Sequence, residues 1–137
     1  MASEDVAVLT RAYEALNSGN TAAALDALDE QAEWHEHSSL PEAGSYRGRA
    51  AIGAFLGSFL ESWEEFRQET EECVDAGDRV AIMLHSFARG KGSGIAVEMR
   101  YAHVWTMRDG KGVRVDTYES ADEALGALRE SSERQQA

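Results

Sequence analysis

The sequence is poor in cysteine, in basic residues and in long apolar runs. Cys73 is the only cysteine among 137 residues, so no internal disulfide and no cysteine-based zinc site can form. Lysine and arginine total 13 against 25 aspartates and glutamates, which gives a formal net charge of −12. This balance argues against nucleic-acid partners and against docking on anionic membranes, because both need clustered basic residues.

Targeting signals are also missing from the chain. No apolar run approaches the roughly twenty residues that a membrane-spanning helix requires. The acidic start, residues 1–5, lacks the basic region of a secretory signal. We therefore expect a cytoplasmic location.

Apolar residues recur at helical spacing in the first half of the chain. Val6, Leu9, Tyr13 and Leu16 form the stripe of an amphipathic helix that ends near Gly19. A short second helix is expected over 21–29 and a short strand over 32–37. The third helix, over 49–65, has a wide apolar face. That face comprises Ile52, Phe55, Leu56, Phe59, Leu60 and Trp63.

The second half of the chain changes to the spacing of strands. Strands are expected over 66–75, 79–89, 95–107 and 113–119. A capping-box pattern at 120–123 opens a closing helix, and residues 131–137 form a polar C-terminal tail. Helices followed by strands indicate the α+β class. A bent antiparallel sheet wrapped around the long third helix would enclose a pocket, the usual place for a ligand.

Five short motifs occur in an order that resembles one family. They are residues 46–52 (YRGRAAI), 75–80 (DAGDRV), 89–94 (RGKGSG), 103–111 (HVWTMRDGK) and 123–125 (EAL). Together they are similar to SnoaL-like proteins of the nuclear-transport-factor-2-like (ketosteroid isomerase-like) superfamily. The resemblance implies a cone-shaped fold over a single domain, residues 1–130, and a homodimer packed through the outer sheet face. It does not specify the chemistry, because such proteins include isomerases, polyketide cyclases, epoxide hydrolases, dehydratases and non-enzymes.

Glu36 and His103 are the candidate catalytic residues. In the isomerases that the chain resembles, a general-base carboxylate lies in the short strand before the third helix, at or near Glu36. A carboxylate in an apolar pocket becomes a stronger base. His103 resembles in position the acid that stabilises the oxyanion, and a histidine can donate a hydrogen bond to a carbonyl there. The alternatives are a solvated carboxylate and a structural histidine.

The sequence departs in two places from the catalytic residues of the enzymes that it resembles. The isomerase tyrosine of the first helix aligns with Ala12, one position before Tyr13, which counts against isomerase chemistry. The final-strand aspartate of the epoxide hydrolases aligns with Thr117, and their Arg and Asp align with 84–86, where neither occurs. Asp116 is near but has the wrong strand parity. These departures favour ligand binding without catalysis as the alternative function.

Aromatic and polar side chains near the two catalytic candidates are expected to contact a ligand. An aromatic pocket suits a flat polycyclic molecule, although most such residues simply form the core. The expected ligand contacts are Trp34, His35, Phe55, Phe59, Tyr101, Trp105 and Thr117.

Metal and phosphate sites are weakly indicated. His35, His37 and Glu33 would share one strand face, where they could ligate a metal. No distant ligand is identifiable, so we expect neither a metal nor a cofactor. The glycine-rich segment 90–94 fits no phosphate-binding pattern and lies between two strands, which favours a sheet bend.

These inferences lead to one function and its rival. The first is a small-molecule pocket protein that acts as a cofactor-independent acid/base enzyme, of isomerase or cyclase type, on an apolar carbonyl or polycyclic substrate. Glu36 would then abstract a proton while His103 hydrogen-bonds the enolate. The alternative is a non-catalytic ligand-binding domain of the same fold, and a protein-association module using the sheet face is a weaker third.

Overall fold

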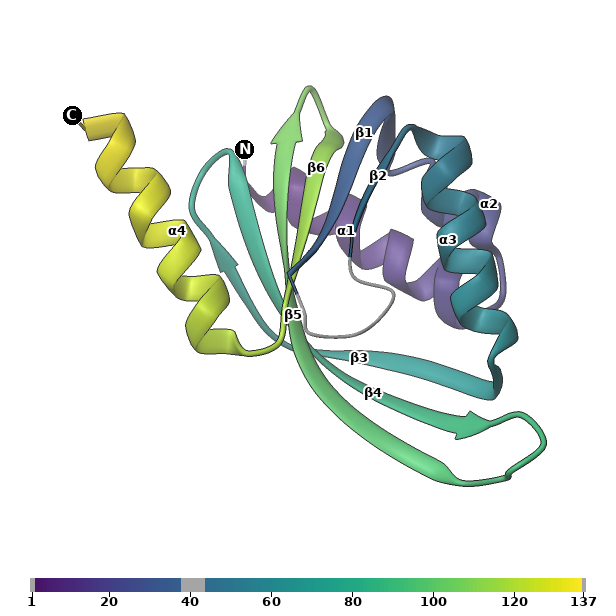
Figure 1. Cartoon of the computed structure of the whole chain (residues 1–137). Helices are drawn as coiled ribbons and strands as arrows, with labels where there is room; N and C mark the ends of the chain where they lie inside the picture. The colour runs from purple at the N-terminus through teal and green to yellow at the C-terminus, as the bar shows by residue number, and fades with distance from the viewer. Residues whose placement is uncertain (1, 38–43, 137) are drawn as a thin grey trace.

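The computed structural model describes residues 2–37 and 44–136, and the side chains of residues 4–36 and 44–129. Within these ranges the chain forms four helices and six strands (Figure 1). They are α1 (Ala2–Asn17), α2 (Thr21–Leu25), β1 (Leu28–His37), β2 (Ser45–Arg47), α3 (Arg49–Glu61), β3 (Trp63–Asp75), β4 (Arg79–Gly90), β5 (Ala96–Arg108), β6 (Lys111–Tyr118) and α4 (Ala121–Gln136). None of the helices in this part of the chain is long and apolar enough to cross a membrane.

The six strands form one sheet in the order β2-β1-β6-β5-β4-β3. Every neighbouring pair is antiparallel except β1 and β6, which run parallel. The sheet is therefore mixed, and the expectation of a wholly antiparallel sheet is wrong at this one pair. The chain leaves β1 through β2 and α3 and returns only after three more strands, so no tight hairpin sets the direction of this pair.

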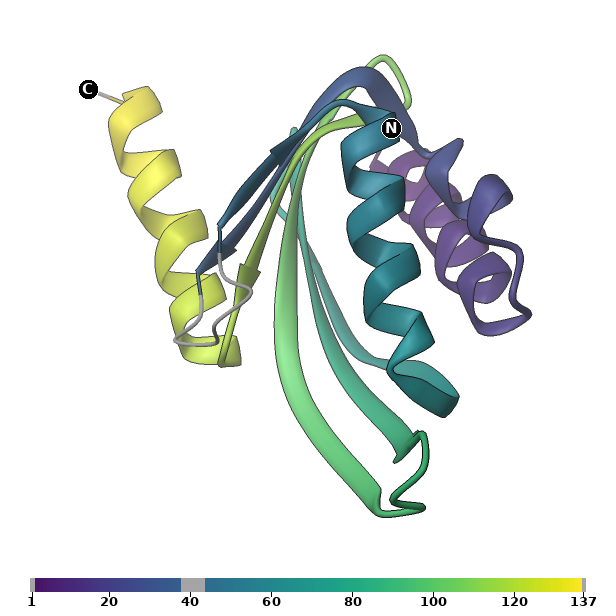
Figure 2. The same cartoon turned by 45° about the vertical axis from the view of Figure 1, so that its right-hand side comes forward.

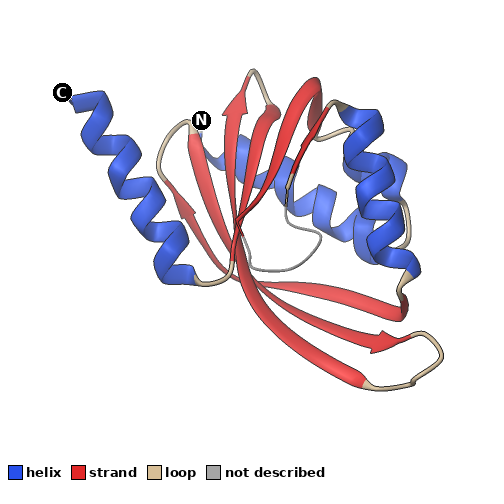
Figure 3. Cartoon of the chain, viewed as in Figure 1, coloured by secondary structure: helices blue, strands red, loops and turns tan. Residues whose placement is uncertain are grey.

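The sheet is strongly curved, as Figure 3 shows for the long strands. Register shifts interrupt β3 between Trp63 and Glu65 and between Thr70 and Glu72, and a further shift lies between Thr106 and Met107 of β5. Such irregularities bend a strand and increase its twist. The curvature gives the sheet a concave face, which α1, α2 and α3 cover, and a convex face, on which α4 lies (Figure 2).

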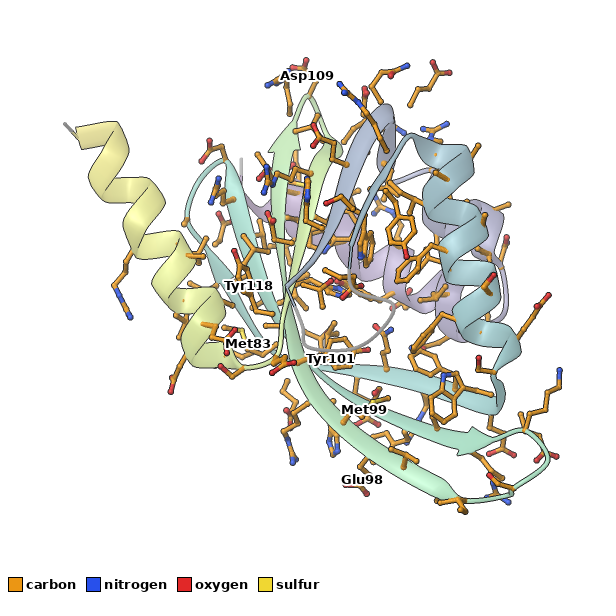
Figure 4. All side chains as sticks on the ribbon, in the orientation of Figure 1. Met83, Glu98, Met99, Tyr101, Asp109 and Tyr118 are labelled. Carbon is orange, nitrogen blue, oxygen red and sulfur yellow. The ribbon has the colours of Figure 1, made fainter. Side chains whose placement is uncertain are left out.

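Each face of the sheet has its own apolar core. On β4, Val80 and Ile82 belong to the concave-side cluster together with Leu9 of α1 and Ile52 of α3. The alternate residues point the other way. Met83 packs in a second cluster with Ala124 and Leu128 of α4, and Figure 4 labels it close to that helix. Side-chain alternation on strands covered on both faces explains the continuous apolar run of β4.

α1 ends as its sequence predicts. Gly19 adopts φ +84°, a left-handed conformation that glycine tolerates without strain. Its amide and that of Asn20 bond back to the carbonyls of Leu16 and Ala15. The Asn20 side chain then caps α2 by accepting a hydrogen bond from the amide of Ala23 at 3.0 Å.

Several element boundaries differ from those expected. α2 ends at Leu25 and β1 begins at Leu28, and α3 ends at Glu61. Trp63 therefore begins β3, opposite Gly90 of β4, and is not on the helix. Strand pairing outweighs the helical spacing of its side chain, since tertiary contacts override local propensity. The short strand β2 was not expected, and α4 continues to Gln136 through part of the segment assigned to the tail.

Candidate functional site

A cavity of about 290 Å³ lies between the concave face of the sheet and the helices. Leu16, Leu25 and Phe59 contribute to its wall from α1, α2 and α3, and Phe66 contributes from β3. The lining is largely apolar and aromatic. The chain thus builds the expected pocket from its curved sheet and three helices.

Eight of the nine predicted site residues line this cavity. They are Trp34, Glu36, Phe55, Phe59, Tyr101, His103, Trp105 and Thr117. On β5, Met99 and Tyr101 share the cavity face with His103, and Figure 4 labels both along that strand. Their odd-numbered spacing is the alternation expected of a strand.

His35 is the exception, because it lies on the opposite face of β1. Its Nε2 lies 2.9 Å from Glu33 Oε1, and its Nδ1 lies 2.7 Å from Ser45 Oγ of β2. Neither partner lines the cavity. Since Trp34 and Glu36 alternate with His35, the strand presents the tryptophan and the carboxylate to the cavity and the histidine to the other side. His35, one of the expected ligand contacts, therefore does not line the cavity.

Thr117 of β6 lies between Glu36 of β1 and His103 of β5 in the register of the sheet. The register of the parallel pair places Glu36 opposite Thr117 of β6, and the antiparallel pair places Thr117 opposite His103. Two strand spacings separate the backbones of Glu36 and His103 by roughly 10 Å. Trp34 Nε1 donates a hydrogen bond of 2.8 Å to Glu36 Oε1, which orients the carboxylate. A ligand between the two side chains would be about one ring system wide.

His103 is buried and bonded to a residue far away in the sequence. Its Nδ1 lies 2.6 Å from the Tyr13 hydroxyl of α1, and Trp105 Nε1 donates to the same hydroxyl at 2.9 Å. The ring stacks on Tyr13 and meets Trp34 edge-on at a centroid distance of 5.2 Å. Burial lowers the pKa of His103 to about 3, so the imidazole is neutral at neutral pH.

Two tyrosines of the cavity, Tyr13 and Tyr101, keep their hydroxyl protons. Burial raises the pKa of Tyr13 far above its ordinary value, although the hydrogen bond from Trp105 opposes the shift. Burial likewise raises the pKa of Tyr101, and the nearby charge of Glu36 adds to that shift. Both side chains therefore act as neutral hydrogen-bonding groups.

Tyr13 is the site residue that sequence reasoning missed. The alignment placed Ala12 at the isomerase tyrosine position and counted its lack of a hydroxyl against isomerase chemistry. Both Ala12 and Tyr13 line the cavity, and the hydroxyl that the alignment lacked comes from the next residue. The available signal was that Tyr13 is the only polar-tipped residue in the apolar stripe of α1.

Two other features that the sequence raised are Asp116 of β6 and the metal-ligand candidates of β1. Asp116 forms a two-contact ion pair with Arg114, at 2.9 and 3.0 Å, and it lies opposite Val104, a convex-side core residue. Asp116 is thus turned away from the cavity, as its strand parity predicted. Among the side chains described, no three His, Cys, Asp or Glu are grouped to hold a metal ion; the side chain of His37 lies outside the described residues.

The Cys73 residue is exposed overall, but partial desolvation of its thiol, together with the nearby Asp75, raises the pKa of that thiol. A thiol with a raised pKa is less ionised and is a poor nucleophile at neutral pH. Cys73 is therefore a poor candidate for a catalytic nucleophile.

Comparisons with known proteins agree with this architecture. TerC, which was crystallised with polyporic acid, is 20% identical, with a TM-score of 0.77 over 92% of this chain and 98% of its own. A nuclear-transport-factor-2-like protein from Burkholderia thailandensis is 26% identical, with a TM-score of 0.75 over 88% of this chain and 96% of its own. A protein of ketosteroid isomerase-like fold from Catenulispora acidiphila, in complex with trimethylamine, is 18% identical. Its TM-score is 0.74 over 87% of this chain and 89% of its own.

Sequence comparison supplies the family. A search of curated proteins finds no match. The model of the SnoaL-like domain family matches residues 9–115, which include α2, α3 and the cavity-forming strands β1 and β5. The chain therefore belongs to the SnoaL-like domain family and has the nuclear-transport-factor-2-like fold.

Proposed function

We propose that this protein is a cofactor-independent acid/base enzyme, of isomerase or cyclase type, that acts on a small apolar carbonyl compound or polycyclic substrate. The observation that carries the proposal is that a carboxylate and a neutral imidazole face one aromatic cavity. Glu36 and His103 both line it, on strands separated by β6 alone. A base and a hydrogen-bond donor placed on either side of a substrate are the groups that enolisation requires.

The reaction begins at a carbon beside the carbonyl group. Glu36 takes a proton from that carbon, and the electron pair moves onto the carbonyl oxygen, where His103 donates a hydrogen bond to the developing enolate. Returning the proton to another carbon gives an isomer. Attack of the enolate carbon on a second carbonyl of the same molecule instead closes a ring, and the alkoxide that forms takes back the proton held by Glu36. A neutral donor suits this role because it stabilises the enolate without protonating it outright.

The walls of the cavity favour a flat aromatic or polycyclic ligand. Trp34 and Phe55 meet at a centroid distance of 6.1 Å, and Trp105 lies edge-on to Trp34 at 6.5 Å. Phe59 and Tyr101 extend the aromatic lining. A volume near 290 Å³ is at the small end of ligand pockets. The crystallisation of TerC with polyporic acid supports a small-molecule ligand in this fold.

Hydrogen–deuterium exchange of 2-tetralone in D2O tests the proposal without knowledge of the natural substrate. This flat bicyclic ketone has acidic C–H groups beside its carbonyl, and mass spectrometry counts the deuterium gained. We expect the protein to accelerate exchange, and Glu36→Gln to lose about 10²- to 10⁴-fold of the acceleration. Replacing His103 with leucine should cost about 10²- to 10³-fold.

Glu33→Gln is the matched control, because Glu33 is on the same strand but faces away from the cavity, bonded to His35. It should exchange like the wild type. Full exchange activity in a folded Glu36→Gln protein would show that Glu36 is not the base.

Ligand binding without catalysis is the second candidate function. The observation that favours it is that Glu36 Oε1 already accepts a hydrogen bond from Trp34, which suits an orienting carboxylate as well as a base. Quenching of tryptophan fluorescence by flat aromatic ligands, with neither deuterium exchange nor product formation, would support this alternative.

A further inference from the structure

The hydroxyl of Tyr13 has a role that the proposed reaction leaves open. Resting on that proposed function, we propose that Tyr13 is a positioning residue that donates its proton to His103 Nδ1 and so holds His103 as the tautomer with Nε2–H directed at the ligand. The cavity then selects a ligand with an acceptor oxygen, a carbonyl or an enolate, beside His103.

The direction of the hydrogen bond follows from counting protons. A tyrosine hydroxyl has one proton and two acceptor lone pairs, and an indole N–H can only donate. Trp105 Nε1 therefore fills one lone pair of Tyr13 Oη, at 2.9 Å. The 2.6 Å contact between Tyr13 Oη and His103 Nδ1 needs one proton, which comes from either partner.

The alternative direction leaves a buried proton unpaired. If His103 Nδ1–H donated, the Tyr13 oxygen would accept two hydrogen bonds and its own proton would need a third partner. No other described residue bonds that hydroxyl, and Tyr13 is 8% exposed. Because a buried donor without an acceptor is costly, the proton of Tyr13 goes to His103 Nδ1.

The tautomer of His103 then follows. A neutral imidazole has one N–H, so Nδ1 as an acceptor requires the proton on Nε2. His103 Nε2 forms no hydrogen bond with a described residue, and the atom keeps some accessible surface. His103 lines the cavity, so a ligand can reach this N–H. The opposite tautomer would present a lone pair there and would repel a carbonyl or enolate oxygen.

The two hydrogen bonds that join Trp105, Tyr13 and His103 also fix the position of the imidazole ring. Trp105 and His103 share one face of β5, while Tyr13 lies on α1, so the contact links the sheet to the helix. Two hydrogen bonds of Asn17 hold α1 against β3. The Asn17 side chain donates to the carbonyl of Gln68 and accepts from the amide of Gln68, both at 2.8 Å. Tyr13 is thereby presented to His103 from a braced helix.

Nitrogen-15 NMR of the histidine rings tests the assignment in the ligand-free protein. Long-range proton–nitrogen correlations distinguish a protonated ring nitrogen from an unprotonated one. We expect Nε2 of His103 to be protonated and Nδ1 unprotonated at pH 7, and Tyr13→Phe to convert this pattern into a mixture of tautomers. Tyr118→Phe is the matched control, because Tyr118 lines the cavity without bonding His103, and it should leave the pattern unchanged.

A proton on Nδ1 in the wild type would overturn the proposal. So would a Tyr13→Phe protein with the wild-type pattern. Should Tyr13→Phe not fold, the wild-type spectrum still decides, because the position of the ring proton in the wild type is by itself the predicted quantity.

Exchange of 2-tetralone separates this inference from the proposed function. Tyr13→Phe should lower kcat about tenfold with little change in KM, the loss of about one hydrogen bond in the transition state. If the NMR pattern is as expected but the wild type catalyses no exchange, the proposed reaction fails and the tautomer assignment stands. If exchange depends on Glu36 but Nδ1 is protonated, the reaction stands and the role of Tyr13 fails.

Discussion

His103 is a polar side chain enclosed by aromatic rings. It is 5% exposed, with Tyr13 stacked on one side, Trp34 edge-on, and Tyr101 tilted at 5.5 Å between centroids. Charging the ring in these surroundings costs far more than in water, and this desolvation is the cause of its lowered pKa. The neutral form of His103, which the proposed reaction uses, is thus a consequence of packing.

The buried histidine predicts a pH dependence of stability. Unfolded, His103 binds a proton below pH 6.5, whereas in the folded protein it does so only near pH 3. Protonation of His103 in the unfolded chain therefore does not affect the free energy of unfolding above about pH 6.5. As the pH drops from there toward 3, the free energy of unfolding falls by up to about 1.4 kcal/mol per pH unit. Urea denaturation at pH 7, 6 and 5 measures this slope.

Comparison with His103→Leu isolates the contribution of this one ring. Other groups that titrate in this range are common to both proteins, so the difference between the two slopes belongs to His103. The variant should lose less stability than the wild type between pH 7 and 5. Parallel slopes would show that the folded protein protonates His103 as readily as the unfolded chain does.

At the scale of single elements, β6 is fitted closely against β5. A Cβ on Gly112 would lie 2.6 Å from Cε3 of Trp105, a distance that side chains do not tolerate. The amide of Gly112 also donates to the carbonyl of Ala27 at 2.7 Å. The absence of a side chain at Gly112 therefore lets β5, β6 and the start of β1 approach closely. They meet beside Trp105, which donates a hydrogen bond to Tyr13.

Substitutions at two glycines should consequently act in opposite directions. Gly112→Ala should lower the free energy of unfolding by about 1–3 kcal/mol, because the added methyl group overpacks a buried tryptophan. Gly57→Ala, within α3, meets nothing within 4 Å and should raise it by about 0.5–1 kcal/mol through helix propensity. Urea denaturation measures both, and a neutral Gly112→Ala would mean that Trp105 is free to move.

The helices and strands show which parts of the fold local pattern can predict. α1 and its glycine end, the strands β4, β5 and β6 and the start of α4 follow from spacing, turns and caps, all of which operate within a few residues. The ends of α2 and α3 do not. Trp63 fits the helical face by spacing, but pairing with β4 takes it into β3, and no local signal contains that contact.

At the scale of the molecule, acidic residues are concentrated along one edge of the sheet. β3 is the edge strand, and its glutamates, including Glu64, Glu69 and Glu72, are exposed. Charged side chains on an edge strand discourage pairing with another chain. The opposite edge is β2, which is only three residues long. Association by adding strands edge to edge is therefore unfavourable at both ends.

We predict a homodimer that associates through the convex face. α4 occupies the part of that face above β4 and β5, while Glu33, His35, Arg114 and Asp116 form polar contacts over β1 and β6. Light scattering after size-exclusion chromatography should give twice the 15.0 kDa mass of one chain. A monomer mass at every protein concentration would contradict the prediction.

The sequence by itself determined the fold family, the α+β class, the two catalytic candidates and most of the aromatic lining. Periodicity and turn chemistry are local, and alternation along β5 places Met99, Tyr101, His103 and Trp105 on one face wherever the strand packs. Only the tertiary structure decided that β1 runs parallel to β6 and that Glu36, not His35, faces the cavity. It also brought Tyr13 to His103 across 90 positions. Such contacts depend on where whole elements pack, and a single sequence carries no local signal for that.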